Sequence, residues 1–204
     1  MAAAAALLLL AGPASAASVD FAALDKAVAE EVNLARTQPQ AYAATLETYR
    51  AAFRGKLAPM SGGRWIHTLE GAAAVDEAVT FLEAQTPLAP LSWNGLLAEA
   101  AEDHARDQGP RGLVGHEGAD GSTPRTRIER YAVWTGVAAE DISYGYGVAR
   151  EAARQLIIDD GVPDRGHRTN IFDPRLRLVG VACGPHAGYR VMCVLDFAAT
   201  VRAR

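Results

Sequence analysis

Two histidines in glycine-containing segments are the residues best suited to chemistry. His116 lies in LVGHEG and His167 in DRGHRTN, contexts in which an imidazole could face a cleft. Two acidic residues could complement them: Glu140 in AAEDISYG and Asp159 at the end of an expected helix. Two imidazoles and two carboxylates suit either a borderline metal such as zinc or a general acid/base pair. Because the four residues are not close in sequence, their types alone leave both possibilities open.

Common catalytic motifs are absent from the sequence. It contains no G-x-S-x-G nucleophile elbow, no H-E-x-x-H zinc helix, no Walker loop and no G-x-G-x-x-G after a strand, and we expect no organic cofactor. The chain has 24 acidic and 20 basic residues and a net charge of -4, without a local basic patch, so nucleic acid is not an expected partner. With 50% hydrophobic residues it can bury a core, which excludes an intrinsically disordered chain.

The start of the chain has the composition of an export signal. Residues 1–16 carry no charge, and their apolar run is shorter than the roughly 20 residues of a membrane-spanning helix. The closing Ala14-Ser15-Ala16 fits an A-x-A cleavage site. We expect a secretory signal peptide over residues 1–16, no transmembrane segment, and a secreted, periplasmic or extracellular protein. The alternative is a frayed alanine-rich tail.

The only two cysteines lie on either side of a predicted turn. Cys183 and Cys193 flank the turn-rich GPHAG, and two β-branched runs around it predict a hairpin. With the turn centred near Ala187 to Gly188, the thiols would lie opposite each other on paired strands. Export would permit a disulfide, whereas two buried thiols acting as small hydrophobic groups are the alternative.

Hydrophobic periodicity and turn residues predict the remaining elements. Helices are expected over 20–38, 41–53, 70–85, 94–107 and 148–158. Thr123 and Pro124 have the types of a helix N-cap and first helical residue, Gly55 to Trp65 reads as a loop, and strands are expected from Arg177 onward. Residues 143–147 could form another strand or its turn. The order of these elements predicts an α+β sandwich with a mostly antiparallel sheet covered by helices.

Five segments form an ordered set along the chain. They are NLAR at residues 33–36, PLSWNGLLAEAAEDHARD, GHEGADGSTPRTRI, AAEDISYGY and GHRTNIFDPRLRLVGVACG. In this order and at these intervals they resemble the CAP superfamily of cysteine-rich secretory proteins, antigen 5 and plant pathogenesis-related proteins, in its bacterial secreted form. The resemblance covers most of the chain from about Ala27 to Ala199. It implies one CAP domain over residues 17–199, with a helical insertion at about 39–88 and a C-terminal tail at 200–204.

The resemblance also implies a fold and a site. The fold is a three-layer α-β-α sandwich whose central cleft is lined by two histidines and two acids. Matched by motif, these fall on His116, Glu140, Asp159 and His167, and some family members hold zinc or another divalent cation there. Asp141 replaces the amide that follows the family's glutamate, and Asp159 stands where glutamate is usual. We expect its shorter side chain to loosen the metal geometry.

Three functions are compatible with that resemblance. The first is a non-enzymatic binding module for a lipid, glycan or protein ligand outside the cell. The second is a metal-dependent, protease-like hydrolase with Glu140 as general base. The third is a structural or adhesion protein of the envelope with a vestigial site. His104, in the A-x-x-H-x-x-D helix, is predicted to be a buried, hydrogen-bonded structural histidine rather than a ligand.

Overall fold

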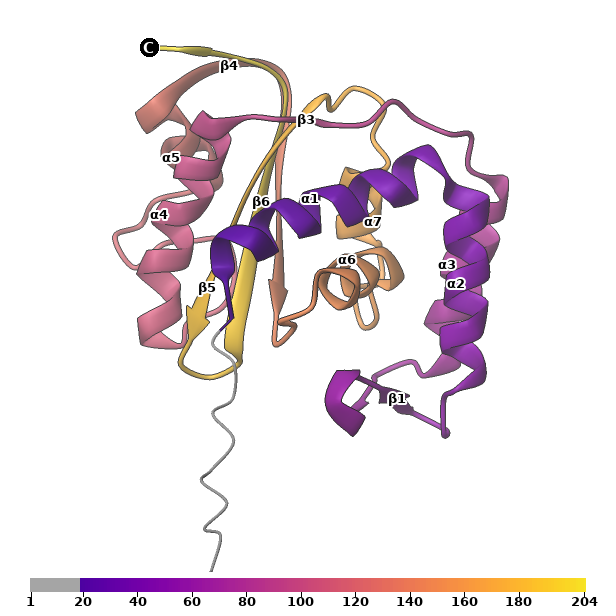
Figure 1. Ribbon diagram of the computed structural model, residues 1–204. Coiled ribbons are helices and arrows are strands. Elements are labelled where there is room, and N and C mark those ends of the chain that lie inside the picture. Colours follow the sequence, from indigo (N-terminus) through magenta and orange to yellow (C-terminus); the bar gives the residue numbers. More distant parts are fainter. Residues whose placement is uncertain (1–18) are drawn as a thin grey trace, which may run out of the picture.

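The computed structural model describes residues 19–204, so the expected signal peptide at 1–16 lies outside the described residues. Its main sheet has four strands in the order β3-β5-β6-β4 (Figure 1). β5 (Leu178–His186) and β6 (Arg190–Ala203) pair antiparallel, and β6 also pairs antiparallel with β4 (Ala132–Tyr144). The short β3 (Ser92–Trp93) runs parallel to β5. The sheet is therefore mixed but mostly antiparallel, and β4 is one of its edges.

Helices cover both faces of this sheet, which confirms the predicted α+β sandwich (Figure 1). α4 (Gly95–Arg111) and α5 (Pro124–Tyr131) pack on one face. On the other face lie α1 (Phe21–Thr37), α6 (Ala149–Ile158) and α7 (Gly166–Ile171). Apolar residues of β5 and β6 alternate between the two helical layers, as the two-residue period of a strand requires.

Residues 39–88, the expected insertion, form a side lobe of their own (Figure 1). Its elements are α2 (Pro39–Ala51), β1 (Leu57–Pro59), the 3-10 turn η1 (Ser61–Gly63), β2 (Trp65–His67) and α3 (Ala72–Ala84). α2 and α3 pack against each other, and α3 also contacts α6. The lobe is therefore joined to the helical layer that contains α6 and α7.

Local capping explains where several helices begin. Asp20 accepts a hydrogen bond from the Ala23 amide and caps α1. Thr123 caps α5 as predicted, and its side chain accepts from the Thr126 amide in a capping box. Pro39, which was expected only to end the first helix, occupies the first turn of α2, where its missing N–H costs nothing.

Two expectations need correction. The loop predicted over residues 55–65 is wrong, because β1 and β2 pair there as a small antiparallel hairpin. The residues set apart as a C-terminal tail continue β6 to Ala203, which pairs with the first residue of β4. The sequence also did not predict most of β4 or the short α7. No helix among the described residues is long and apolar enough to cross a membrane.

The hairpin and its disulfide are confirmed. Cys183 and Cys193 are direct partners in the register of β5 and β6, with Cα atoms 4.0 Å apart and a disulfide between them. The turn falls at residues 187–189, since His186 pairs with Arg190. The bond therefore joins two strands that the sheet already holds together.

Reduction of this disulfide should lower stability without unfolding the protein. A cross-link closing so short a loop removes entropy from the unfolded chain equivalent to about 2–3 kcal/mol. Urea unfolding of oxidised and reduced protein would measure the difference in the free energy of unfolding. A loss of all cooperative unfolding on reduction would contradict this account, because the remaining strand pairing should maintain the fold.

Candidate functional site

His116 is held by a buried carboxylate on the edge strand. It lies in the segment between α4 and α5, with half of its side chain exposed, and its Nδ1 lies 2.8 Å from Glu140 Oε1. The other oxygen of Glu140 accepts from the buried guanidinium of Arg127 at 2.6 Å. Arg127 also donates to the His116 carbonyl at 3.0 Å. One arginine therefore fixes both the Glu140 side chain and the His116 backbone.

The environment of Glu140 keeps it ionised. Burial alone would raise its pKa, but the hydrogen bond with His116 and the charge of Arg127 outweigh burial and lower the pKa below its usual value. Across the strand pair, Asp196 is the register partner of Glu140. Burial, reinforced by the negative charge of Glu140, raises the pKa of Asp196 well above its usual range. These opposite shifts favour the negative charge on Glu140 over Asp196.

A buried carboxylate also holds His167, as Glu140 holds His116. Asp159 ends α6 in the left-handed conformation, with φ 59°, which aspartate tolerates better than most residues. Its carboxylate accepts from the His167 amide at 2.9 Å and lies 2.6 Å from Nδ1 of the ring. Burial alone would lower the pKa of His167, but Asp159 and the charge of Asp141 raise it above its usual value. The shorter acid therefore still reaches both the amide and the ring of His167.

The inserted lobe braces the segment between Asp159 and His167. Arg165 donates to Glu70 at 2.7 Å and to Glu77 at 2.6 Å, and both acids belong to residues 39–88. The same arginine donates to the Asp159 carbonyl at 2.8 Å. Arg165 has φ 50°, a left-handed conformation that these contacts compensate. The lobe consequently helps to set the position of the second histidine.

Asp141 follows Glu140 on β4 and contacts the layer that contains α7. It is fully buried on β4, and its Oδ1 accepts from the Asn170 side chain of α7 at 2.7 Å. Burial raises its pKa to about 7, against the opposing effects of His167, Asn170 and His116. Because both imidazoles act on this one carboxyl group, both lie within its electrostatic range.

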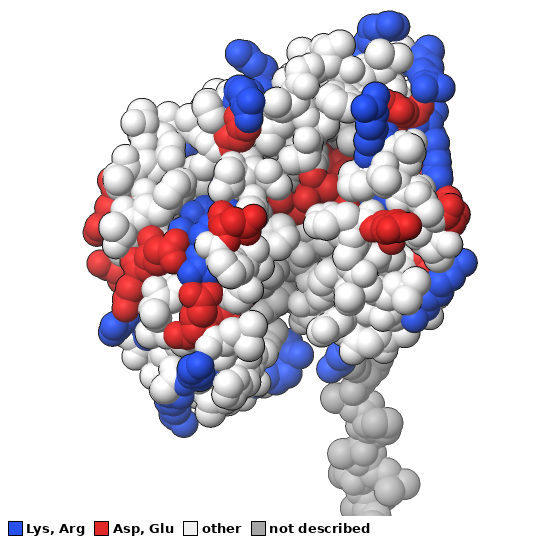
Figure 2. Space-filling view, turned by 180° about the vertical axis from the view of Figure 1, so that it is seen from behind, with Lys and Arg blue, Asp and Glu red and all other residues white. Residues whose placement is uncertain are grey.

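The His116–Glu140 pair and the His167–Asp159 pair approach β4 from opposite faces. Glu140 shares its face with Ile142, which packs against α4, whereas Asp141 points to the α7 side. Since β4 is an edge strand, groups from the two layers can meet beyond its free edge. The space-filling view shows a hollow on one side of the molecule with acidic side chains in its depth (Figure 2). A concave acidic surface concentrates cations.

Residues 19–204 contain no group of three or more His, Cys, Asp or Glu side chains arranged to hold a metal ion. Glu140 is occupied by Arg127 and His116, and Asp159 by His167. The ring nitrogens Nε2 of the two histidines make no hydrogen bond within the same part of the chain. These two nitrogens are therefore the donors that the site offers.

His104 is a structural histidine, as predicted. It is fully buried on α4, and its Nε2 lies 2.9 Å from the carbonyl oxygen of Gly115. Gln108 donates to the same carbonyl at 2.7 Å, and the Tyr144 hydroxyl accepts from the Gly115 amide at 3.0 Å. Burial lowers the pKa of His104 and keeps the ring neutral. This network fixes the chain directly before His116.

Sequence reasoning missed the groups that orient the four predicted residues. They are Arg127, Asn170 and Asp196, together with the bracing Arg165, Glu70 and Glu77. Arg127 carried one usable signal, since it precedes the apolar Ile128 on the buried side of a short helix. A charged residue at such a position needs a buried partner. Nothing in the sequence identified that partner as Glu140.

Comparison with known proteins places these motifs in a family. Residues 30–197 match the model of the CAP family, the cysteine-rich secretory protein family. No curated protein sequence matches the chain significantly. Two solved structures are similar at 18% identity. An outer surface protein of Borrelia burgdorferi has a TM-score of 0.47 over 54% of this chain and 78% of that protein.

The second similar structure is an extracellular protein with an SCP domain from Bacillus anthracis, with a TM-score of 0.44. The match covers 66% of this chain and 45% of that protein, so the chain spans less than half of its length. The family model, by contrast, covers most of this chain, including β4 and both histidine segments. The protein therefore belongs to the cysteine-rich secretory protein (CAP) family.

Proposed function

We propose that the protein is a secreted CAP-domain binding module whose His116 and His167 together hold one divalent cation. One observation carries this proposal: each imidazole is anchored through Nδ1 to a buried carboxylate, which leaves Nε2 available. Metal-binding histidines are usually oriented in this way, because the carboxylate fixes the tautomer and makes the other nitrogen a better donor. Glu140 and Asp159 would then orient the ligands rather than bind the cation themselves.

The donor set fits an open site. Two imidazole nitrogens suit zinc, copper or nickel better than calcium or magnesium, which prefer oxygen. With two protein ligands, the remaining coordination positions are left to water or to an acidic group of the bound ligand. When bound, the cation would supply a positive charge that attracts and polarises such a group. The hollow with acidic side chains in Figure 2 is a surface that would attract cations.

The hydrolase alternative is disfavoured by the state of Glu140. A general base needs a free oxygen within reach of the attacking water. Both Glu140 oxygens are occupied, by His116 and by Arg127, and its side chain is buried. Its lowered pKa also makes it a weak base. We therefore propose binding rather than catalysis as the role of this cleft.

Two further observations support an extracellular binding role. The Cys183–Cys193 disulfide fits an oxidising compartment. Beside His116, a cavity of about 410 Å³ is lined mainly by apolar parts of α5 and β4, including Ile128 and Trp134. A cavity of this size and composition suits the apolar portion of a lipid, glycan or protein ligand whose polar end reaches the histidines.

Metal analysis of purified protein tests the proposal. After incubation with zinc at neutral pH and desalting, the wild-type protein should retain about one zinc ion per chain, because both Nε2 donors are present. The double variant His116→Ala, His167→Ala should retain none. A His67→Ala variant, which changes an exposed histidine of the inserted lobe, is the matched control and should behave as wild type. Equal zinc content in the wild type and the double variant would refute the metal site.

A further inference from the structure

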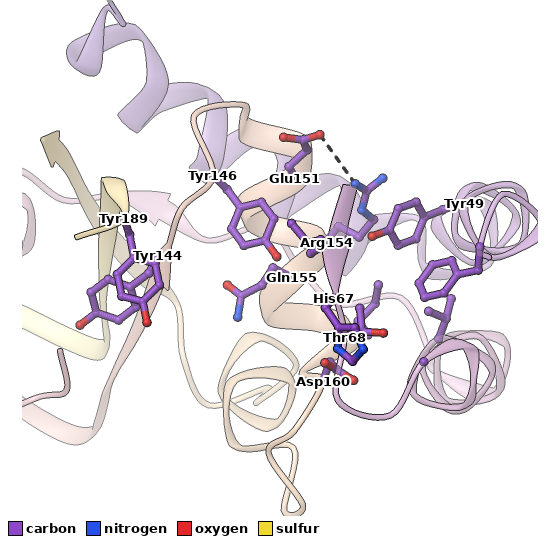
Figure 3. A pocket seen from close by; sticks show the side chains of 15 residues that line it. Tyr49, His67, Thr68, Tyr144, Tyr146, Glu151, Arg154, Gln155, Asp160 and Tyr189 are labelled. Atoms are coloured by element: carbon purple, nitrogen blue, oxygen red, sulfur yellow. Dashed lines mark ion pairs between the residues drawn. The ribbon is translucent and has the colours of Figure 1, made fainter. Parts of the chain in front are cut away.

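A second cavity lies between the inserted lobe and the body of the domain (Figure 3). Its volume is about 240 Å³. The lobe supplies one wall, with residues from α2, β2 and the start of α3, among them Tyr49, His67 and Val75. The opposite wall consists of α6, the end of β4 and the turn between β5 and β6. The insertion thus encloses a space that the body alone would leave open.

Four of the fifteen residues that line this cavity are tyrosines. Figure 3 shows Tyr49 on the side of the lobe and Tyr146 on the side of the body, with Tyr144 and Tyr189 further along the wall. Tyrosine presents a flat apolar ring together with a hydroxyl that can donate or accept a hydrogen bond. Such a wall suits a ligand that is both ring-shaped and rich in hydroxyl groups.

The charged groups of the cavity already have partners within the protein. Glu151 accepts from the Ser61 amide at 2.6 Å, and Asp160 accepts from the Leu69 amide, also at 2.6 Å. Arg154 stacks over the Tyr49 ring at 3.5 Å and lies 3.9 Å from Glu151 (Figure 3). These contacts join the lobe to the body, and the lining keeps an excess of negative charge, two carboxylates against one guanidinium, which disfavours an anionic ligand.

Gln155 has an unsatisfied group at this cavity. Its Oε1 atom is buried and accepts no hydrogen bond from any residue between 19 and 204. In Figure 3 the Gln155 amide lies between Tyr146 and Asp160, facing the cavity. A buried acceptor without a donor destabilises the fold, so a structural role does not account for it. A ligand hydroxyl group would supply the missing donor.

We propose that this cavity binds a neutral saccharide ring, with its C–H face on the tyrosines and one hydroxyl group donating to Gln155. The lining residues favour a neutral saccharide over an anionic group and over a fatty acid chain. A phosphate or sulfate group would need a free cation, but Arg154 is paired with Glu151 and stacked on Tyr49. A fatty acid chain would leave Gln155 unsatisfied. The volume, just below the range usual for small-molecule sites, suits one sugar ring rather than a long chain.

Saturation-transfer NMR with the full protein tests this proposal directly. The probes are glucose, galactose, mannose and N-acetylglucosamine at millimolar concentration, with laurate and inorganic phosphate as representatives of the other two classes. At least one sugar should bind the wild-type protein. The variant Gln155→Leu should bind it at least about tenfold more weakly, because one buried hydrogen bond is lost. Tyr146→Phe, which keeps the ring, should weaken binding by a smaller factor.

Stability measurements separate a binding role from a structural one. Gln155→Leu should unfold at the same or a higher urea concentration than the wild type, since it removes an unsatisfied buried acceptor. Gln85→Leu, at a half-buried position outside this cavity, is the matched control and should bind as the wild type does. The proposal is overturned if none of the four sugars binds, if Gln155→Leu binds equally well, or if laurate or phosphate is preferred.

Discussion

Replacing Arg127 by Met should lower the free energy of unfolding by about 3–5 kcal/mol, because it leaves a buried carboxylate without its partner. The side chains of Arg127 and Glu140 are each 1% exposed, and their N–O distance is 2.6 Å. Arg127 also satisfies the carbonyl groups of His116 and Ser122, each at 3.0 Å. The substitution keeps the volume but removes all three contacts. Urea unfolding monitored by circular dichroism measures the loss.

Arg125→Met is the matched control for this variant. Arg125 lies on the same helix, its side chain is 71% exposed, and it pairs with Glu129 on the surface. Its replacement should cost less than about 1 kcal/mol. The double variant Arg127→Met, Glu140→Gln should regain part of the stability, because the unpaired buried charge disappears. Equal losses for Arg127→Met and Arg125→Met would show that the buried pair does not hold the site.

The variant Asp141→Asn should become more stable than the wild type as the pH rises. Asp141 has a pKa of about 7 in the folded protein, against 3.8 for an ordinary aspartate. The folded state therefore binds this proton more tightly than the unfolded state, and stability falls as the pH rises from about 4 to about 7. The pKa difference corresponds to about 4 kcal/mol. Asparagine avoids this loss and keeps an acceptor for Asn170.

Unfolding of the two proteins should be compared at pH 4 and at pH 8. The stability of Asp141→Asn relative to the wild type should increase between these values by up to about 4 kcal/mol. Asp76→Asn is the control: Asp76 is exposed, and its hydrogen bond with Arg50 lowers its pKa, so its effect should not change above pH 4. Stability curves of wild type and Asp141→Asn that run parallel from pH 4 to pH 8 would contradict the burial argument.

The elements that could be predicted from the sequence are those with a local physical signal. The spacing of apolar residues located α1, and the Thr123-Pro124 pair located the start of α5. The turn residues between Cys183 and Cys193 located the hairpin and its disulfide. In each case the deciding interactions lie within about a dozen residues. Residue types and context singled out the four candidate site residues, and the family resemblance connected them, which no local pattern does.

β4 could not be predicted because its sequence conceals the two-residue period of a strand. Gly136 lies where the register with β6 shifts, between Thr135 and Ala138. Two consecutive acids, Glu140 and Asp141, then occupy buried positions that are normally apolar. Both are stabilised by partners from other elements. A strand that departs from its pattern at a functional site is expected, since such sites place polar groups where packing would favour apolar ones.

The way in which the short Asp159 side chain reaches His167 could not be predicted from the sequence. Sequence reasoning considered side-chain length alone. The left-handed conformation of Asp159 turns the chain at the end of α6 and brings the His167 amide and ring to the carboxylate. The bracing of this turn by Arg165 and Glu77 joins residues far apart in sequence, so only the folded structure shows it.

The most direct test of the central claim is a zinc titration of the wild type, the single variants His116→Ala and His167→Ala, and the double variant by calorimetry. If one cation is shared, the wild type binds one zinc ion, and each single variant weakens binding at least about tenfold. The double variant should then be little worse than the weaker single variant, because either loss already breaks the shared site. Two zinc ions in the wild type with one left in each single variant, or no binding at all, would contradict the account.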